Sequence, residues 1–241
     1  MRLPRLYVPQ PLPLKQTMVL GEAASHYLSK VLRMQEDQPL ILFNGDGVQV
    51  SAHITLVHKK RVEVLATANL AGPDASPLHT HLGQVMSRGE RMDYVIQKAT
   101  ELGVSEITPL FSSRCEVKLD PQRQAKRLTH WQQIAISACE QSGRIHIPTI
   151  HFPATFEDWI NKTVADTKLV LHPHQTQALI DQRAPQSCAL LIGPEGGLTD
   201  LEVEQAQAQG YTGLRLGPRI LRTETAPVAA LTLLQHIWGD F

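Results

Sequence analysis

The sequence predicts an α/β protein in which a small β-rich domain precedes a larger domain built on a parallel sheet. Short strand-like segments dominate residues 1–70, whereas strand-like and helical segments alternate after residue 77. Such alternation is typical of a parallel sheet that helices cover on both faces. Between the two regions, Ala71–Pro77 contains Gly, Pro and Ser without any periodicity. We therefore expect one domain at residues 1–72 and a second at residues 73–241.

The first region has the pattern of a small β-barrel. Two strand-like segments, Leu40–Phe43 and Gln49–Leu56, flank Asn44-Gly45-Asp46-Gly47, which is a strong signal for a tight turn. Arg61–Ala68 alternates apolar and polar residues and is expected to form a third strand. One helix is expected at Ala23–Leu32, with an apolar stripe on one face. The stripe consists of Tyr27, Leu28, Val31 and Leu32.

The second region alternates strands with helices. The expected strands are His79–Met86, Ile107–Phe111, Leu169–Leu171, Cys188–Ile192 and Gly213–Leu216. The expected helices are Arg91–Leu102, Pro121–Ser142, Thr199–Gly210 and Ala226–Trp238. Gly103 fits the position after a helix end, and Thr199 with Glu202 forms a capping-box pattern at a helix start.

Composition excludes several classes of protein. The 241 residues are 42% hydrophobic, which suits a globular core, and no apolar run reaches the roughly 18 residues of a membrane helix. The N-terminal segment has several prolines and lacks the apolar stretch of a signal peptide. The three widely spaced cysteines point to reduced thiols in a cytoplasmic protein. With 23 basic and 23 acidic residues, the chain has no net charge, so any RNA-binding surface must be a local patch.

Three strands near the C-terminus each end in a loop of unusual composition. The loops are Leu171–His174, Ile192–Gly197 and Leu216–Thr225, the second reading IGPEGG and the third LGPRILRTET. Ligands bind outside the carboxyl ends of parallel strands, and glycines let the backbone approach a ligand closely. The loops could be ordinary strand-to-helix turns, but turns seldom carry so many charges. We therefore expect one shared pocket for a nucleotide-like cofactor.

Other binding sites find little support. The chain has no GxxxxGK[ST] segment and no GxGxxG with an acidic residue about 20 positions later, so neither a P-loop nor a dinucleotide site is expected. His172 and His174 have no third metal ligand nearby in the sequence. No metal is therefore expected.

Two segments in these loops, LLIGPEGGLTDLE and LRLGPRILRTETA, resemble the RsmE family of ribosomal RNA methyltransferases within the SPOUT superfamily. Further segments match the same family: HYLSKVLRM, RMDYVIQKATELGV, RCEVK and ACEQSGR. The resemblance extends over nearly the whole chain.

The resemblance implies a C-terminal SPOUT α/β domain with a deep trefoil knot and a PUA-like β-barrel in front of it that binds RNA. It implies a homodimer formed through the knotted domain. It also implies S-adenosylmethionine (SAM) as methyl donor and N3 of uridine 1498 in the 16S RNA of the 30S subunit as the acceptor. Two alternatives stay open: a SPOUT enzyme with another RNA substrate, and an RNA-binding or ribosome-assembly factor without catalysis.

The candidate cofactor and catalytic residues lie in these loops, and the candidate RNA contacts lie elsewhere in the chain. The expected cofactor-binding residues are Leu171, His172, Gly193, Gly196, Leu216, Gly217, Ile220 and Leu221. Arg222 is the first catalytic candidate, because a guanidinium stays charged and can stabilise an anionic uracil. Glu195 and Glu224 are candidate bases, with loop capping and helix-dipole roles as their structural alternatives.

The candidate RNA contacts are Arg2, Arg5, Lys30, Arg33, Arg88, Arg91, Arg114 and Arg144.

Overall fold

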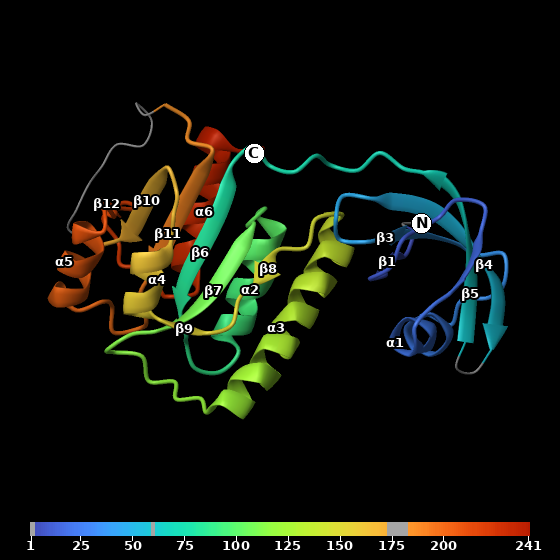
Figure 1. Cartoon of the computed structure of the whole chain (residues 1–241), viewed down its shortest axis with the longest axis horizontal. Coiled ribbons are helices and arrows are strands. Elements are labelled where there is room, and N and C mark those ends of the chain that lie inside the picture. The colour runs from blue at the N-terminus through green and yellow to red at the C-terminus, as the bar shows by residue number, and fades with distance from the viewer. Residues whose placement is uncertain (1–2, 59–60, 173–182) are drawn as a thin grey trace. The chain divides into compact units, whose positions relative to one another are not determined.

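The computed structural model describes residues 3–58, 61–172 and 183–241, which fold into two units (Figure 1). The first unit comprises Met1–Ala75 and Cys139–Ile147, and the second comprises Ser76–Ala138 and Pro148–Phe241. The first unit thus consists of two segments, and the second segment begins more than sixty residues after the first one ends. In the described ranges, no helix is long and apolar enough to span a bilayer.

The first unit is built on a five-stranded sheet in the order β1-β3-β4-β5-β2. Its strands are β1 (Arg5–Tyr7), β2 (Thr17–Val19), β3 (Pro39–Phe43), β4 (Gln49–His58) and β5 (Arg61–Asn69). All neighbours are antiparallel except β1 and β3. Val62, Val64 and Ala66 are fully buried, as their alternation predicts. The small β-domain is confirmed.

The turn between β3 and β4 is formed by the predicted residues. The Asn44 side chain accepts hydrogen bonds from the backbone N–H groups of Asp46 and Val48, at 3.0 and 3.1 Å. Gly45 and Gly47 have φ values of 87° and 94°, which favour glycine. Local side-chain chemistry therefore determines this hairpin.

The predicted helix at Ala23–Leu32 is present, but its predicted apolar stripe is wrong. An α-helix, α1 (Glu22–His26), continues as a π-helix, η1 (Tyr27–Val31). Of the four stripe residues only Leu28 is buried, and Val31 is 59% exposed. A π turn has more residues per turn than an α-helix, so positions that share a face at α spacing are rotated apart.

The second unit contains a parallel sheet in the order β12-β10-β11-β6-β7-β8, with β9 also pairing with β7. Its strands are β6 (His79–Val85), β7 (Glu106–Phe111), β8 (Thr149–Ile150), β9 (Ala154–Thr155), β10 (Thr167–Leu171), β11 (Ser187–Ile192) and β12 (Thr212–Leu214). Its helices are α2 (Arg91–Glu101), most of α3 (Pro121–Ser142), α4 (Phe156–Lys162), α5 (Asp200–Ala208) and α6 (Thr225–Trp238).

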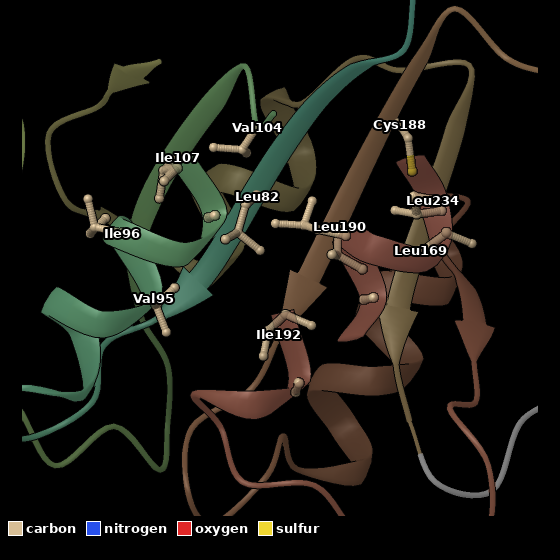
Figure 2. Packing of buried hydrophobic residues seen from close by; sticks show 14 of the residues in the cluster. Leu82, Val95, Ile96, Val104, Ile107, Leu169, Cys188, Leu190, Ile192 and Leu234 are labelled. Carbon is tan, nitrogen blue, oxygen red and sulfur yellow. The ribbon is translucent and has the colours of Figure 1, made fainter. Parts of the chain in front are cut away.

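Helices cover both faces of this sheet, as predicted. Residues of α2, α3 and α6 pack on one face, around strand residues such as Leu82, Leu190 and Ile192 (Figure 2). On the other face, Phe156 and Trp159 of α4 and residues of α5 pack against the alternate strand positions. Strand β11 is therefore apolar on both sides, which explains its nearly continuous apolar sequence, whereas β6 also carries polar residues.

Local signals in the second unit are confirmed, and several elements differ. Thr199 and Glu202 form the predicted capping box, and Gly103 follows the C-cap of α2 with a φ of 82°. The last strand ends at Leu214 instead of Leu216. The short elements β8, β9 and α4 were not predicted, because two-residue strands and a seven-residue helix offer little periodicity. The knot stays a prediction, since residues 173–182, in the connection between β10 and β11, lie outside the described residues.

Candidate functional site

The carboxyl ends of β10, β11 and β12 meet around a cavity of about 700 Å³ in the second unit. The three neighbouring strands are parallel, so the loops that follow them emerge at one edge of the sheet. The cavity is lined by Leu171, His172, residues 192–198, Asp200, residues 215–217, residues 219–224, Ala226 and Arg91. The volume is in the range of pockets that hold small ligands.

Every residue predicted to bind the cofactor lines this cavity, as do the three candidate catalytic residues Arg222, Glu195 and Glu224. The structure therefore brings together three loops that are separated in the sequence. His174, at the end of the first loop, lies outside the described residues. The walls combine aliphatic side chains such as Leu171 and Leu221 with glycine backbone, which suits a ligand with both apolar and hydrogen-bonding parts.

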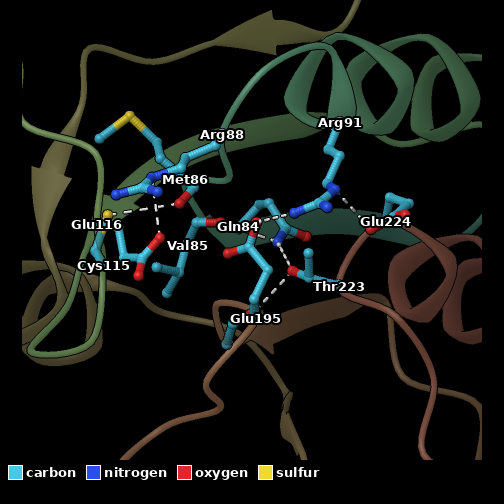
Figure 3. Close-up of polar contacts among 11 residues, drawn as sticks. Gln84, Val85, Met86, Arg88, Arg91, Cys115, Glu116, Glu195, Thr223 and Glu224 are labelled. Carbon is cyan, nitrogen blue, oxygen red and sulfur yellow. Dashed lines mark hydrogen bonds and ion pairs between the residues drawn. The ribbon is translucent and has the colours of Figure 1, made fainter.

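A chain of hydrogen bonds joins two of the loops to the sheet (Figure 3). Gln84 of β6 is fully buried, and its Nε2 donates to Thr223 Oγ1 at 3.2 Å and to the Val85 carbonyl at 3.0 Å. Thr223 Oγ1 in turn donates to the Gly193 carbonyl at 2.9 Å. The third loop is thereby attached to the second loop and to the core of the sheet.

Two arginines predicted to contact RNA hold the GPEGG loop in place. Arg91, the first residue of α2, places its guanidinium 2.6 Å from Glu195 Oε1 and 3.9 Å from Glu224 Oε2 (Figure 3). Arg114 donates to the carbonyl oxygens of Gly196 and Leu198, at 2.8 and 3.3 Å. Both side chains therefore help to position the GPEGG loop, and they also remain candidate RNA contacts.

Arg222 differs from these two arginines. It is exposed at the cavity, and its guanidinium has no hydrogen bond or ion pair among the described residues. Its backbone carbonyl accepts from the N–H groups of Thr225 and Ala226, which tie the end of the loop to the start of α6. The backbone of Arg222 is thus held in place, and its guanidinium stays available for a ligand.

Beside the first cavity lies a second one of about 640 Å³, which shares Arg91 and Glu195 with it. Its other lining residues are Arg88, Gly89, Glu90 and Glu116. Arg88 pairs with Glu116 at 2.9 Å, and both side chains are more than 60% exposed. The pair is therefore weak and open to competition from another anion.

The remaining RNA-contact candidates lie in the first unit. Lys30 and Arg33 are exposed, and Arg33 has a positive φ of 53°. Arg5 instead donates to Gln49 and to the carbonyls of Gly143 and Arg144, and lies over the Phe43 ring. Arg144 is half-buried. Arg2 lies outside the described residues.

Sequence reasoning missed Gln84, Thr223, Arg215 and Arg219 as site residues. Arg219 is exposed at the cavity, and Arg215 donates to the Gly217 carbonyl at 3.1 Å. The sequence could have indicated Gln84 as a site residue, because it is a polar residue inside the apolar strand sequence LGQVM. A buried polar side chain needs hydrogen-bond partners and often marks a structured site.

Comparison with known proteins agrees with this geometry. A family model described as an RNA methyltransferase domain matches residues 74–235, and one described as an RNA methyltransferase PUA domain matches residues 20–66. The ribosomal RNA small subunit methyltransferase E of Buchnera aphidicola (from Schizaphis graminum) is 39% identical, over 99% of this chain and 98% of its own length. The protein of the same name from Bacillus subtilis is 32% identical, over 90% and 89%.

Two solved structures of methyltransferases also match the whole chain. A methyltransferase from Legionella pneumophila in complex with bound SAM is 42% identical, with a TM-score of 0.96 over 100% of both chains. Ribosomal RNA small subunit methyltransferase E from Neisseria gonorrhoeae, bound to S-adenosyl methionine, is 40% identical, with a TM-score of 0.94 over 100% of both chains. This protein belongs to the ribosomal RNA small subunit methyltransferase E family.

Proposed function

We propose that this protein is a SAM-dependent methyltransferase that methylates N3 of uridine 1498 in the 16S RNA of the small ribosomal subunit. The observation that carries the proposal is the convergence of three loops on one cavity, where Arg222 presents a guanidinium with no partner among the described residues. The names of the full-length relatives and the SAM-bound structures support the substrate class and the cofactor.

The cavity fits SAM in size and chemistry. Leu171, Leu216 and Leu221 offer apolar contacts for an adenine ring, and the backbone around Gly193 and Gly196 can approach a bent ligand. His172, Gly217 and Ile220 complete the proposed cofactor set. When bound, SAM would supply an activated methyl group on sulfur.

The residues of this chain have to prepare the acceptor. N3 of uridine carries a proton and is a poor nucleophile until that proton leaves, so the site needs a base or a group that stabilises the imide anion. We assign the stabilising role to Arg222. Glu224 and Glu195 are the proposed proton acceptors, and Arg91 between them holds both carboxylates at the cavity wall.

The remaining assignments rest on the family resemblance. We infer a PUA-like RNA-binding domain at residues 1–72 and a knotted methyltransferase domain at residues 73–241, which forms a homodimer in the cytoplasm. Lys30, Arg33 and Arg88 are exposed and are the RNA contacts that we propose first. Arg2, Arg5, Arg91, Arg114 and Arg144 stay candidates from the sequence.

Nucleoside mass spectrometry of 16S RNA from cells with and without the gene tests the reaction. We expect 3-methyluridine to disappear on deletion and to return with the wild-type gene. Loss of a methylated uridine from another RNA would favour a different substrate. Unchanged methylation of every RNA would favour a binding factor without catalysis.

Arg222→Ala tests the catalytic role. The variant should bind SAM in calorimetry as the wild type does, yet fail to restore 3-methyluridine. Arg127→Ala, which removes an exposed arginine of α3 in the same unit, is the matched control and should restore it. Normal turnover by Arg222→Ala would remove Arg222 from the mechanism.

A further inference from the structure

Four side chains of types that can bind metal ions lie near the amino-terminal edge of the parallel sheet. His79 and His81 lie on β6, Glu106 is the first residue of β7, and His151 follows β8. His81 pairs in register with Glu106, and Glu106 pairs with Thr149, two residues before His151. Because side chains alternate along a strand, this register directs all four to the same face of the sheet, where α4 packs.

Three of the four side chains also meet in space, and His79 contacts one of these three, Glu106. His79 Nε2 lies 3.2 Å from Glu106 Oε1, and His151 Nε2 lies 2.5 Å from Glu106 Oε2. The His81 and His151 rings have centroids 5.3 Å apart. One ligand atom each from His81, Glu106 and His151 lies within 4.8 Å of the others. Among the ion pairs of the described residues, Glu106 has histidine partners but no Lys or Arg that a cation would have to displace.

This set of donors matches zinc chemistry. Zn²⁺ binds imidazole nitrogen and carboxylate oxygen at about 2.0–2.2 Å, which places neighbouring tetrahedral ligands about 3.3 Å apart. Small side-chain rotations would bring the donors of His81, Glu106 and His151 to that spacing, because they already lie within 4.8 Å of one another, and His79 already contacts Glu106. Thr108 Oγ1 lies 2.8 Å from His81 Nε2 and can accept a hydrogen bond from it when Nδ1 binds a metal, and such a contact orients a ligating imidazole.

We propose that His79, His81, Glu106 and His151 form a binding site for one divalent transition-metal ion, with Zn²⁺ as its best occupant. The ion would link β6, β7 and the segment after β8. The site lies at the amino ends of the strands, whereas the cofactor cavity lies at their carboxyl ends, so the proposal does not depend on the proposed function. It departs from the sequence-based expectation of no metal, which considered only His172 and His174.

Isothermal titration calorimetry with zinc chloride tests the site, on full-length protein without a histidine tag and after removal of metal by a chelator. We expect one Zn²⁺ to bind per chain. His151→Ala and Glu106→Gln should each weaken binding by more than about tenfold. His26→Ala removes an exposed histidine of α1 outside the cluster and should bind Zn²⁺ as the wild type does.

Thermal unfolding provides the second measurement, since it also reveals whether each variant folds. Zn²⁺ should raise the melting temperature of the wild type and of His26→Ala, but not that of His151→Ala or Glu106→Gln. The proposal is overturned if the wild type binds no Zn²⁺, or if the cluster variants bind it as tightly as the wild type.

Discussion

The side-chain amide of Gln84 donates to the Thr223 hydroxyl over 3.2 Å, although the two residues are 139 positions apart in the sequence. The Thr223 hydroxyl in turn donates a hydrogen bond to the Gly193 carbonyl at 2.9 Å. A buried residue of the central strand β6 thereby helps to determine the positions of two cofactor loops.

Thr223→Val keeps the shape of the side chain and removes the hydroxyl. The Gln84 amide and the Gly193 carbonyl each lose a partner, and one buried unsatisfied group costs about 1–3 kcal/mol. We expect SAM affinity to fall by roughly tenfold, which corresponds to about 1.4 kcal/mol. Calorimetry with SAM measures the change. Thr232→Val, in which a hydroxyl bonded to the carbonyl one turn earlier in α6 is removed, should leave affinity unchanged.

Gln84→Met should separate loop positioning from stability. The Gln84 Oε1 atom is buried without a hydrogen-bond partner in the described residues, so replacing the amide with an apolar group of similar size removes one unfavourable feature. We expect unfolding free energy to change by less than about 1.5 kcal/mol, while SAM binds several-fold more weakly. If denaturant unfolding shows a large loss of stability and SAM affinity is unchanged, Gln84 serves the core and not the loops.

Arg91→Ala should affect turnover more than stability. Its ion pair with Glu195 is partly exposed, at 42% and 37%, so the pair is worth about 1 kcal/mol or less. Without the guanidinium, however, Glu195 and Glu224 are no longer held at the cavity wall. We expect slower methylation of 16S RNA and an almost unchanged melting temperature. Arg123→Ala, which breaks an exposed ion pair with Asp120, should change neither.

Glu202→Gln should destabilise the protein in a pH-dependent way. Burial by itself would raise the pKa of Glu202, but hydrogen bonds from Thr199 and Ser113 outweigh that effect and lower the pKa below its usual value. A lowered pKa in the folded state means that the carboxylate stabilises the fold above the ordinary pKa of glutamate. That stability is lost as the pH falls through the folded-state pKa.

At pH 7 we therefore expect Glu202→Gln to cost about 1 kcal/mol, within the range of helix-capping contributions. The difference from the wild type should shrink as the pH is lowered below the usual pKa of glutamate. Urea unfolding at several pH values measures it. Glu204→Gln, an exposed position of the same helix, should show no such dependence, and a constant difference for Glu202→Gln would contradict the argument.

The sequence alone determined the features that depend on near neighbours. The capping box of Thr199 and Glu202 and the Asn44–Gly47 turn are formed by residues within a few positions of one another, so their chemistry can be read directly. The strand and helix alternation of the second unit was also predicted, because apolar periodicity reports which side of an element is buried. The three loops were identified as one site because parallel strands end at the same edge.

The tertiary structure decided what depends on distant neighbours. The π turn of Tyr27–Val31 moved three of the four stripe residues out of the core, and strand order brought Gln84 to Thr223 and His81 to Glu106 and His151. It also showed that Arg91 and Arg114 hold the GPEGG loop while Arg222 stays open at the cavity. Such contacts join residues many positions apart, and their energies depend on the order and register of the strands, which no local pattern encodes.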